Sequence, residues 1–410
     1  MSANHELEGT EPRHRISQLA TLVNGHPFDS ADFSSDAEVP LVRIRDLTTP
    51  TFETFVPREK VPRFALVRDG DVLIGMDGDF NSVLWNRGEA ALNQRVCLLR
   101  PHRGVDSRYL AYALPTHLKE INDLTWSTTV KHLAAGSVRA IRVPAHSADH
   151  QRAIADYLDR ETAQIDAFIA KNEELIALLT ERRTVAINGM VWSGLGDDAT
   201  PAAVGEALPQ APQHWLRVRN KQLFRERAGL SEDGGGELLT VSHITGVTPR
   251  SEKNVTMFEA ESTVGYKLVH SGDLVINTMW AWMGALGVAS APGIASPAYG
   301  VYRRIGDLPY EPRYFDYIYR SAPYVAKMSV FSRGITDSRL RLYPEAFLRL
   351  PVVVPPLEEQ RAIADRIADQ TAGIDKAVSS ATRGIGLARE RRAALISAAV
   401  TGKIDIAPCV

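Results

Sequence analysis

The chain has 410 residues, of which 44% are hydrophobic and 23% are charged. At about 150 residues per domain this length indicates two or three domains, and the composition excludes wholesale disorder and collagen-like structure. Two cysteines, Cys97 and Cys409, cannot form a disulfide framework or a four-thiolate zinc site, so we expect a reducing, cytoplasmic location. The formal net charge of −2 argues against a protein that coats nucleic acid by bulk attraction, but it leaves room for local basic surfaces.

The first predicted segment, residues 1–13, has no apolar core, so we expect a disordered N-terminus and not a signal peptide. Residues 14–143 then contain short runs of strand character, such as 41–47 (LVRIRDL) and 64–75 (FALVRDGDVLIG), broken by Gly, Pro and Asp. This pattern predicts a mixed, β-rich domain.

A long helix is predicted within residues 144–195. From Gln151 to Leu195 no proline interrupts the chain, and apolar residues recur at intervals of three and four. Pro144 and Asp149 stand before and within the first turn, where proline and acidic residues suit a helix start. Residues 196–212, with their Gly, Pro and Ala, are the predicted linker to the second half.

The second half follows the same order. Residues 213–350 are again predicted to be mixed β, and residues 351–410 begin with Pro355-Pro356 and continue into a proline-free helix from Gln360 to Ile404. One apolar stretch, 274–291 (LVINTMWAWMGALGVASA), is nearly long enough to span a bilayer. Its polar residues and its match to the aspartate-rich segment 70–85 favour a strand, a turn and a strand instead.

The chain is a tandem duplication. Residues 151–195 align with 360–404 at a constant offset of 209 without gaps, and 17 of the 45 positions are identical. The β-rich parts align more loosely, since Gly70-Asp71 matches Gly272-Asp273 at an offset of 202 and Arg108-Tyr109 matches Arg313-Tyr314 at 205. Both halves are therefore expected to share one fold.

Each helix has one apolar stripe that must be buried. Packing the two helices as an antiparallel coiled coil would bury both stripes and relate the halves by a pseudo-twofold axis. We therefore predict an α+β protein in which two β-rich domains in tandem are each followed by a long helix. Duplex DNA has local twofold symmetry of the same kind, and proteins that bind two half-sites mirror it.

Specific motifs carry a family resemblance. Residues 351–376 (PVVVPPLEEQRAIADRIADQTAGIDK) and 390–406 (ERRAALISAAVTGKIDI) resemble the C-terminal conserved region of the specificity (S) subunit of type I restriction-modification systems. Residues 143–166 (VPAHSADHQRAIADYLDRETAQID) resemble the central conserved region of that family, although PAHSADHQ replaces the PPLEEQ form. The resemblance covers the full length through its order: recognition domain, helix, recognition domain, helix.

The resemblance implies a function without chemistry on this chain. An S subunit reads a bipartite, asymmetric DNA target, its helices set the spacer, and it binds two methyltransferase (M) subunits that methylate adenine N6. Restriction and translocation (R) subunits complete the enzyme. S-adenosylmethionine, ATP and Mg are then expected on the partner subunits, and no cofactor, metal or catalytic residue on this chain. No membrane partner is implied.

Two other functions stay open at this stage. The chain could be a coiled-coil protein–protein adaptor whose domains bind peptides, or an autonomous DNA-binding regulator that needs no methyltransferase. Salt-dependent binding to duplex DNA would separate the adaptor from the other two. No methyltransferase motif and no phosphate-binding loop occurs in the sequence, since Gly402-Lys403 lacks the upstream glycine.

The predicted DNA contacts lie in the β-rich domains, where basic and amide side chains can bind base edges and phosphates. A basic loop occurs at matching places in both halves, and two tryptophans and the Trp85-Asn86-Arg87 turn are further candidates, although alternating aromatics more often lie in a core. The predicted DNA-binding residues are Lys131, His132, Arg333, Thr336, Arg339, Arg341, Trp280, Trp282, Asn86 and Arg87.

The predicted M-subunit contacts lie on the helices. Residues 149–183 contain eight acidic and five basic residues, a net charge of −3, which favours contact with protein over contact with phosphate. Polar residues retained in both copies are candidates for docking, or are solvated helix faces: Gln151, Arg152, Asp156, Gln360, Arg361 and Asp365. The repeated Glu-Arg-Arg at 181–183 and 390–392 fits cross-helix ion pairs or partner contacts equally well.

Overall fold

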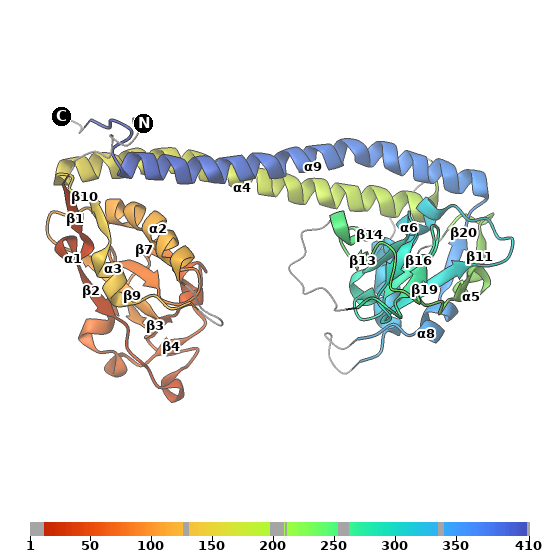
Figure 1. The fold of residues 1–410 in the computed structure, drawn as a ribbon, viewed down its shortest axis with the longest axis horizontal. Coiled ribbons are helices and arrows are strands. Elements are labelled where there is room, and N and C mark those ends of the chain that lie inside the picture. The colour runs from red at the N-terminus through yellow and green to blue at the C-terminus, as the bar shows by residue number, and fades with distance from the viewer. Residues whose placement is uncertain are drawn as a thin grey trace. The chain divides into compact units, whose positions relative to one another are not determined.

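A computed structural model describes residues 12–125, 131–196, 209, 211–252, 262–334 and 340–407. The chain divides into two compact units (Figure 1). Unit 1 comprises Met1–Asn172 and Arg383–Val410, and unit 2 comprises Glu173–Thr382. Each unit therefore contains one globular domain and one part of each long helix. The predicted disordered segment 1–13 and the predicted linker 196–212 lie mostly outside the described residues, but Arg13 belongs to a strand.

Unit 1 contains a small α+β domain. Its elements are β1 (Arg13–Arg15), α1 (Ile16–Leu19), β2 (Ala20–Asn24), β3 (Val39–Val42), β4 (Phe55–Val56), β5 (Leu66–Val67), β6 (Val72–Gly75), β7 (Ser82–Leu84), β8 (Ala90–Leu92), β9 (Val96–Pro101), α2 (Ser107–Leu124), α3 (Ala135–Ala140) and β10 (Arg142–Pro144). An antiparallel sheet has the order β2-β9-β6-β7, and a second sheet has the order β4-β3-β8-β5. The short pair β1-β10 brings the start of the domain beside its end, directly before the long helix α4 (Ala148–Ser193).

Unit 2 repeats this plan. Its elements are β11 (Leu216–Arg219), α5 (Asn220–Leu223), β12 (Phe224–Glu226), β13 (Leu239–Ser242), β14 (Gly246–Pro249), β15 (Lys267–Val269), β16 (Leu274–Asn277), β17 (Leu286–Val288), β18 (Gly293–Ala295), β19 (Tyr299–Arg304), α6 (Pro312–Arg320), α7 (Ala322–Phe331), α8 (Pro344–Arg349) and β20 (Pro351–Val354). The antiparallel sheet β12-β19-β16-β17 corresponds to β2-β9-β6-β7, and the pair β11-β20 corresponds to β1-β10. β20 leads into the second long helix, α9 (Leu357–Val400). The shared fold predicted for the two halves is confirmed.

The apolar segment 274–291 forms β16, a 3-10 turn η6 (Ala281–Met283) and β17. Both strands lie in the main sheet of unit 2, so the predicted strand, turn and strand are confirmed. Among the described residues, no helix is both long enough and apolar enough to cross a bilayer.

Both long helices extend slightly beyond the predicted start. α4 has 46 residues and α9 has 44, and Asp149, Glu358 and Glu359 lie in their first turns. These carboxylates lie where the unsatisfied N–H groups and the positive end of the helix dipole favour negative charge. The two uninterrupted helices confirm the long helices that were predicted from apolar residues at intervals of three and four.

The core of each domain is completed by opposite ends of the two helices. In unit 1, Ile154 and Leu158 of α4 join Ile396 and Val400 of α9 in one buried cluster with the sheet and α2. In unit 2 the corresponding set is Ile363 and Ile367 of α9 with Ile187 and Val191 of α4, each shifted by 209 residues from its counterpart. Burial of matching residues at opposite ends requires that the helix segments run antiparallel in each unit.

Two ion pairs repeat the same arrangement along the helices. Asp166 on α4 binds Arg392 on α9 at 2.9 Å in unit 1, and Asp375 on α9 binds Arg183 on α4 at 2.8 Å in unit 2. The partners are again exchanged at an offset of 209. Both Arg183 and Arg392 belong to the repeated Glu-Arg-Arg motif, so the cross-helix alternative is confirmed for these two arginines, and the antiparallel coiled coil is confirmed as well.

Candidate nucleic-acid interface

The basic loop of unit 2 is anchored beside the end of β16, an inner strand of the main sheet. Arg333 and Arg341 face each other across an antiparallel bridge with two backbone hydrogen bonds of 2.9 Å, and both are exposed. The next residue, Leu342, is buried and donates its N–H to the carbonyl of Thr278, just after β16. The loop therefore presents two guanidinium groups at the end of this strand. Thr336 and Arg339 lie outside the described residues.

Two tryptophans lie on the turn that follows β16. Trp280 is 48% exposed, and its ring stacks on that of Trp282 with a centroid distance of 6.1 Å and an angle of 20°. The Trp282 indole donates to the carbonyl of Met279 at 3.0 Å, which fixes the pair to the turn. The alternating spacing of Trp280 and Trp282 favoured a position in the core. For Trp280, which is exposed, that interpretation is wrong. An exposed indole beside a basic loop can stack on a base.

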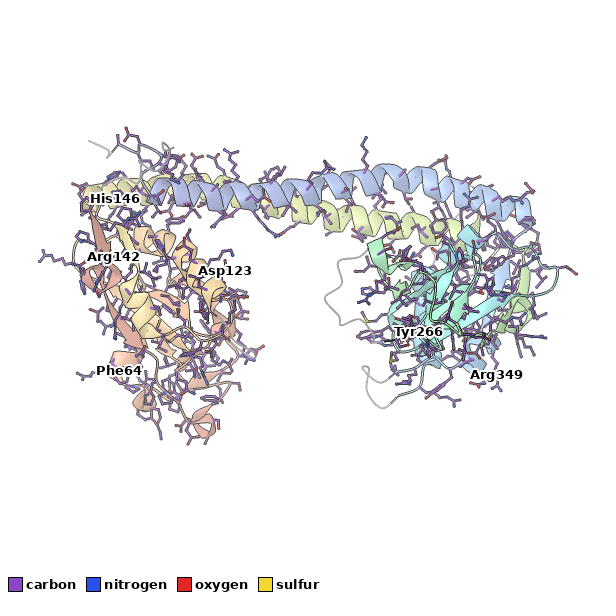
Figure 2. All side chains as sticks on the ribbon, viewed as in Figure 1. Phe64, Asp123, Arg142, His146, Tyr266 and Arg349 are labelled. Carbon is purple, nitrogen blue, oxygen red and sulfur yellow. The ribbon has the colours of Figure 1, made fainter. Side chains whose placement is uncertain are left out.

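Unit 1 places its basic loop at the equivalent strand end. Leu133 donates its N–H to the carbonyl of Met76, as Leu342 does to that of Thr278. His132 contacts the carboxylate of Asp77 at 2.6 Å. Lys131 donates from Nζ to the backbone and side-chain oxygens of Asn122 at 2.7 and 2.9 Å, near the C-terminal end of α2 where Asp123 is labelled in Figure 2.

The Trp85-Asn86-Arg87 turn has a mainly internal role. The Arg87 guanidinium lies over the Trp85 and Phe52 rings at 4.2 and 4.7 Å, and donates to the carbonyls of Asp46 and Thr49, both at 2.6 Å. Burial lowers its pKa, while Asp46 acts in the opposite direction. Arg87 thus stabilises the domain, and its contact with DNA stays a prediction. Asn86 is exposed and keeps that prediction.

A buried ion pair supports the main sheet in each unit. Asp71, before β6, accepts two hydrogen bonds from Arg100 on β9 at 2.9 and 2.6 Å. Asp273, before β16, accepts two from Arg303 on β19 at 2.9 and 2.8 Å. These hydrogen bonds raise the pKa of both arginines. Each aspartate also accepts a hydrogen bond from the backbone N–H of the residue three positions earlier. The sequence alignment matched the two aspartates but did not reveal their arginine partners.

Gln151 and Gln360 are not on the surface. Gln151 is 4% exposed and Gln360 is fully buried. The Gln151 amide accepts from the backbone N–H of Asp106, the residue that caps α2, and donates to the carbonyl of His146. Figure 2 labels His146 where β10 passes into α4. This corrects the docking prediction for both glutamines, because an amide that is buried and bonded within the chain offers no surface to a partner.

The other predicted docking residues are exposed. Asp156 binds Arg108 at 2.7 Å, and its counterpart Asp365 binds Arg313 at 2.7 Å. Arg152 and Arg361 bind acids in the first turn of their own helices, at 3.2 and 2.7 Å. The sequence alignment contained Arg108 and Arg313 as a matched pair, but it gave no indication that they reach the helices.

The helix pairs also carry two equivalent hollows. The hollow in unit 1 has a volume of about 450 Å³, and the hollow in unit 2 has about 470 Å³. Ile165 and Arg391 line the first, and their repeat counterparts Ile374 and Arg182 line the second. Leu387 at the first hollow is identical to its counterpart Leu178, and both are more than half exposed. The two hollows therefore lie at matching places and share part of their lining, while their other lining residues differ.

Comparison with known proteins identifies the first half of the chain. The family model "Type I restriction modification DNA specificity domain" matches residues 13–177. This part of the chain is therefore similar to type I specificity domains. The predicted resemblance to type I specificity subunits is confirmed for the residues that the model covers.

Curated relatives of this specificity domain are similar over a limited length. A stretch of 185 residues, 45% of this chain, is 34% identical to the type I restriction enzyme EcoBI specificity subunit of Escherichia coli and covers 39% of it. The EcoKI specificity subunit of Escherichia coli strain K12 is 24% identical over 191 residues, 43% of this chain and 41% of that protein. The matches thus span about two fifths of these relatives.

One solved structure has the same overall fold. A chain from work on complex assembly and conformational transition of the type I R-M system aligns with 98% of this chain and 100% of its own length, with a TM-score of 0.68 at 14% sequence identity. The predicted α+β architecture with two domains and two long helices is thereby confirmed.

Proposed function

We propose that this chain is the DNA sequence-specificity subunit of a type I restriction-modification enzyme and that it performs no chemistry itself. One observation carries the proposal. Two copies of the same domain attach in the same way to two copies of the same helix, yet the loop after the equivalent strand carries different side chains, with His132 in one and Arg341 in the other. A repeated domain whose loops carry different side chains fits a protein that binds two different half-sites.

Each domain would bind one half of a bipartite, asymmetric target in double-stranded DNA. In the first domain, residues 14–143, the contacts are Lys131, His132 and Asn86. In the second, residues 213–350, they are two guanidinium groups, which pair with guanine or phosphate, and an aromatic stack. These residues are Arg333, Arg341, Trp280 and Trp282, together with Thr336 and Arg339 of the same loop.

The helical regions, residues 144–195 and 351–410, would set the spacer and bind two M subunits. The docking surface we propose includes Arg152, Asp156, Arg361 and Asp365, which are exposed. The two equivalent hollows support a partner that binds twice, because matched apolar surfaces accept two copies of one protein. Exposed apolar surface of this kind marks protein contacts.

The chemistry would belong to the partners. M subunits carrying S-adenosylmethionine would flip one adenine out of each half-site and methylate N6. R subunits, with ATP and Mg, would complete the restriction enzyme. The specificity chain would determine which DNA sequence is bound and how the M and R subunits are arranged around it.

A domain exchange tests this function. Residues 213–350 are replaced by the second domain of another specificity subunit, and the variant is expressed with the M subunit that accompanies the wild-type chain. Sequencing of N6-methyladenine should show one half-site changed and the other half-site and the spacer unchanged. A change in both half-sites would contradict the claim that each domain reads one half-site. Absence of salt-dependent binding to duplex DNA would favour a protein–protein adaptor.

A further inference from the structure

We propose that a duplicated latch fixes each recognition domain to the helix that follows it, and that the latch of unit 1 is the stronger one. The inference rests on the proposed function only where it concerns DNA. Latch 1 consists of Asp106, Arg108, Gln151, Asp156 and Asp159, and latch 2 of Glu311, Arg313, Gln360 and Asp365.

The amide part of the latch is similar in both units, and Gln360 donates one further hydrogen bond, to the carbonyl of Pro309 at 3.2 Å. Gln151 accepts from the N–H of Asp106 at 3.1 Å, and Gln360 accepts from the N–H of Glu311 at 2.7 Å. Each of these donors belongs to the residue that caps α2 or α6. Each glutamine also donates to the carbonyl five residues before it, at 2.9 and 2.8 Å. One buried side chain thus joins the start of the domain helix to the start of the long helix.

The charged part differs between the units. Arg108 reaches two successive turns of α4, with Nη1 at 2.7 Å from Asp156 and 2.8 Å from Asp159, while Nη2 binds Asp106 at 2.9 Å. Tyr112 also donates to Asp159 at 2.7 Å. Arg313 binds Asp365 and Glu311 at 2.7 and 2.8 Å. The counterpart of Asp159 in the repeat is Ala368.

The difference has a mechanical consequence. A guanidinium that binds two carboxylates on successive helix turns resists both sliding and rotation of α2 along α4, because either movement lengthens one of the two bonds. Arg313 has one carboxylate on α9, Asp365. The other charged contact of α9 with this helix start joins Arg361 to Glu311 and is longer, at 3.9 Å, so the charged part of latch 2 resists rotation of α6 less. We infer that domain 1 is held rigidly and that domain 2 tolerates small changes of angle.

A reciprocal exchange tests the latch without DNA. Asp159→Ala gives latch 1 the residue of latch 2, and Ala368→Asp does the reverse. Spin labels at Arg63→Cys and Lys171→Cys report on unit 1, and labels at Arg349→Cys and Lys376→Cys report on unit 2, both in a Cys409→Ser background. We expect a narrower distance distribution in unit 1, broadening with Asp159→Ala, and narrowing of unit 2 with Ala368→Asp.

Lys119→Ala is the control, because Lys119 pairs with Asp123 on α2 itself at 2.6 Å and makes a more exposed ion pair that does not involve α4. It should change neither distribution. Equal widths in the two wild-type units, or widths that neither exchange alters, would overturn the latch. Since Ala368→Asp adds a partner and removes none, it decides the question even if Asp159→Ala unfolds unit 1.

Binding to DNA gives the second readout. The chain with its M subunit is titrated with duplexes that contain both half-sites and a spacer of the normal length, one base pair shorter or one longer. Asp159→Ala should reduce the preference for the normal spacer by about three- to tenfold, as expected for loss of one charge-assisted contact, with the half-site bases unchanged. If the wild type shows no sequence preference, the proposed function fails, and the label distances alone still decide the latch.

Discussion

Units 1 and 2 each have a main sheet with the same strand order, and each is attached to the long helices in the same way. They differ at one strand end of that sheet. In unit 1, Asp77 follows β6 and binds His132 and Arg95, so part of the basic surface is neutralised within the chain. In unit 2 the equivalent place after β16 holds an exposed indole, Trp280, beside Arg333 and Arg341. The comparison shows that the Asp–Arg pairs under the main sheet are the same in both units. The side chains exposed at the end of β6 and β16, which a ligand would contact, differ.

The largest expected effect on DNA binding comes from the strand end of unit 2 that carries Trp280, Arg333 and Arg341. Arg333→Ala and Arg341→Ala should each weaken binding of the cognate duplex by about 1–3 kcal/mol if the guanidinium pairs with a base, and the change should be confined to the second half-site. Trp280→Ala should cost about 1–3 kcal/mol if the ring stacks on a base. Titration of duplexes altered in one half-site at a time measures these effects.

The control for these variants is Arg349→Ala, since Arg349 is an exposed arginine of the same domain on α8 (Figure 2). It removes the same charge without touching the loop. Equal losses for Arg349→Ala and Arg341→Ala would mean that general charge, and not the loop, supplies the affinity.

The largest expected effect on stability should be equal in the two units. Removing Arg100 or Arg303 leaves a buried aspartate without its bidentate partner, which costs about 3–5 kcal/mol for a buried pair. Thermal unfolding followed by calorimetry should show similar losses for Arg100→Ala and Arg303→Ala. A loss below about 1 kcal/mol in either unit would show that this pair behaves like an exposed one and that the scaffolds are not equivalent.

Cys97 distinguishes the units chemically. Burial raises the pKa of its thiol to about 12, whereas the aligned position on β19 is Gly300. A neutral thiol is a poor nucleophile, so a Cys409→Ser chain should not be alkylated by iodoacetamide at pH 8 until unit 1 unfolds. Above pH 9 the unfolded thiol ionises before the folded one, so this residue's contribution to stability is lost as the pH rises towards 12. Rapid alkylation of the folded chain would contradict this burial.

The smallest effect belongs to the cross-helix ion pairs. Arg183–Asp375 and Arg392–Asp166 are each partly exposed, and such pairs contribute about 0.2–1 kcal/mol. A double-mutant cycle with Arg183→Ala and Asp375→Ala should give the same coupling energy as the cycle on the other pair. Clearly unequal coupling energies would show that the two cross-helix ion pairs are not equivalent.

The long helices and the duplication could be predicted from the sequence because spacing and identity repeat over 45 residues. The roles of Gln151 and Gln360 could not, since a polar residue within a helical pattern indicates a solvated face unless the fold brings a second backbone to it. Arg108 and Arg313 were aligned but unassigned for the same reason. The contacts of the Arg87 side chain within the domain could not be predicted either, because Phe52 and the Asp46 carbonyl are distant from it in the sequence.

The most direct test of the account is a map of N6-methyladenine in cells that carry this chain and its M subunit. We predict one methylated motif with two different half-sites and a spacer of constant length, lost when the gene for this chain is deleted. A continuous palindromic motif, or methylation that persists without the chain, would contradict the claim that its two domains select the DNA sequence.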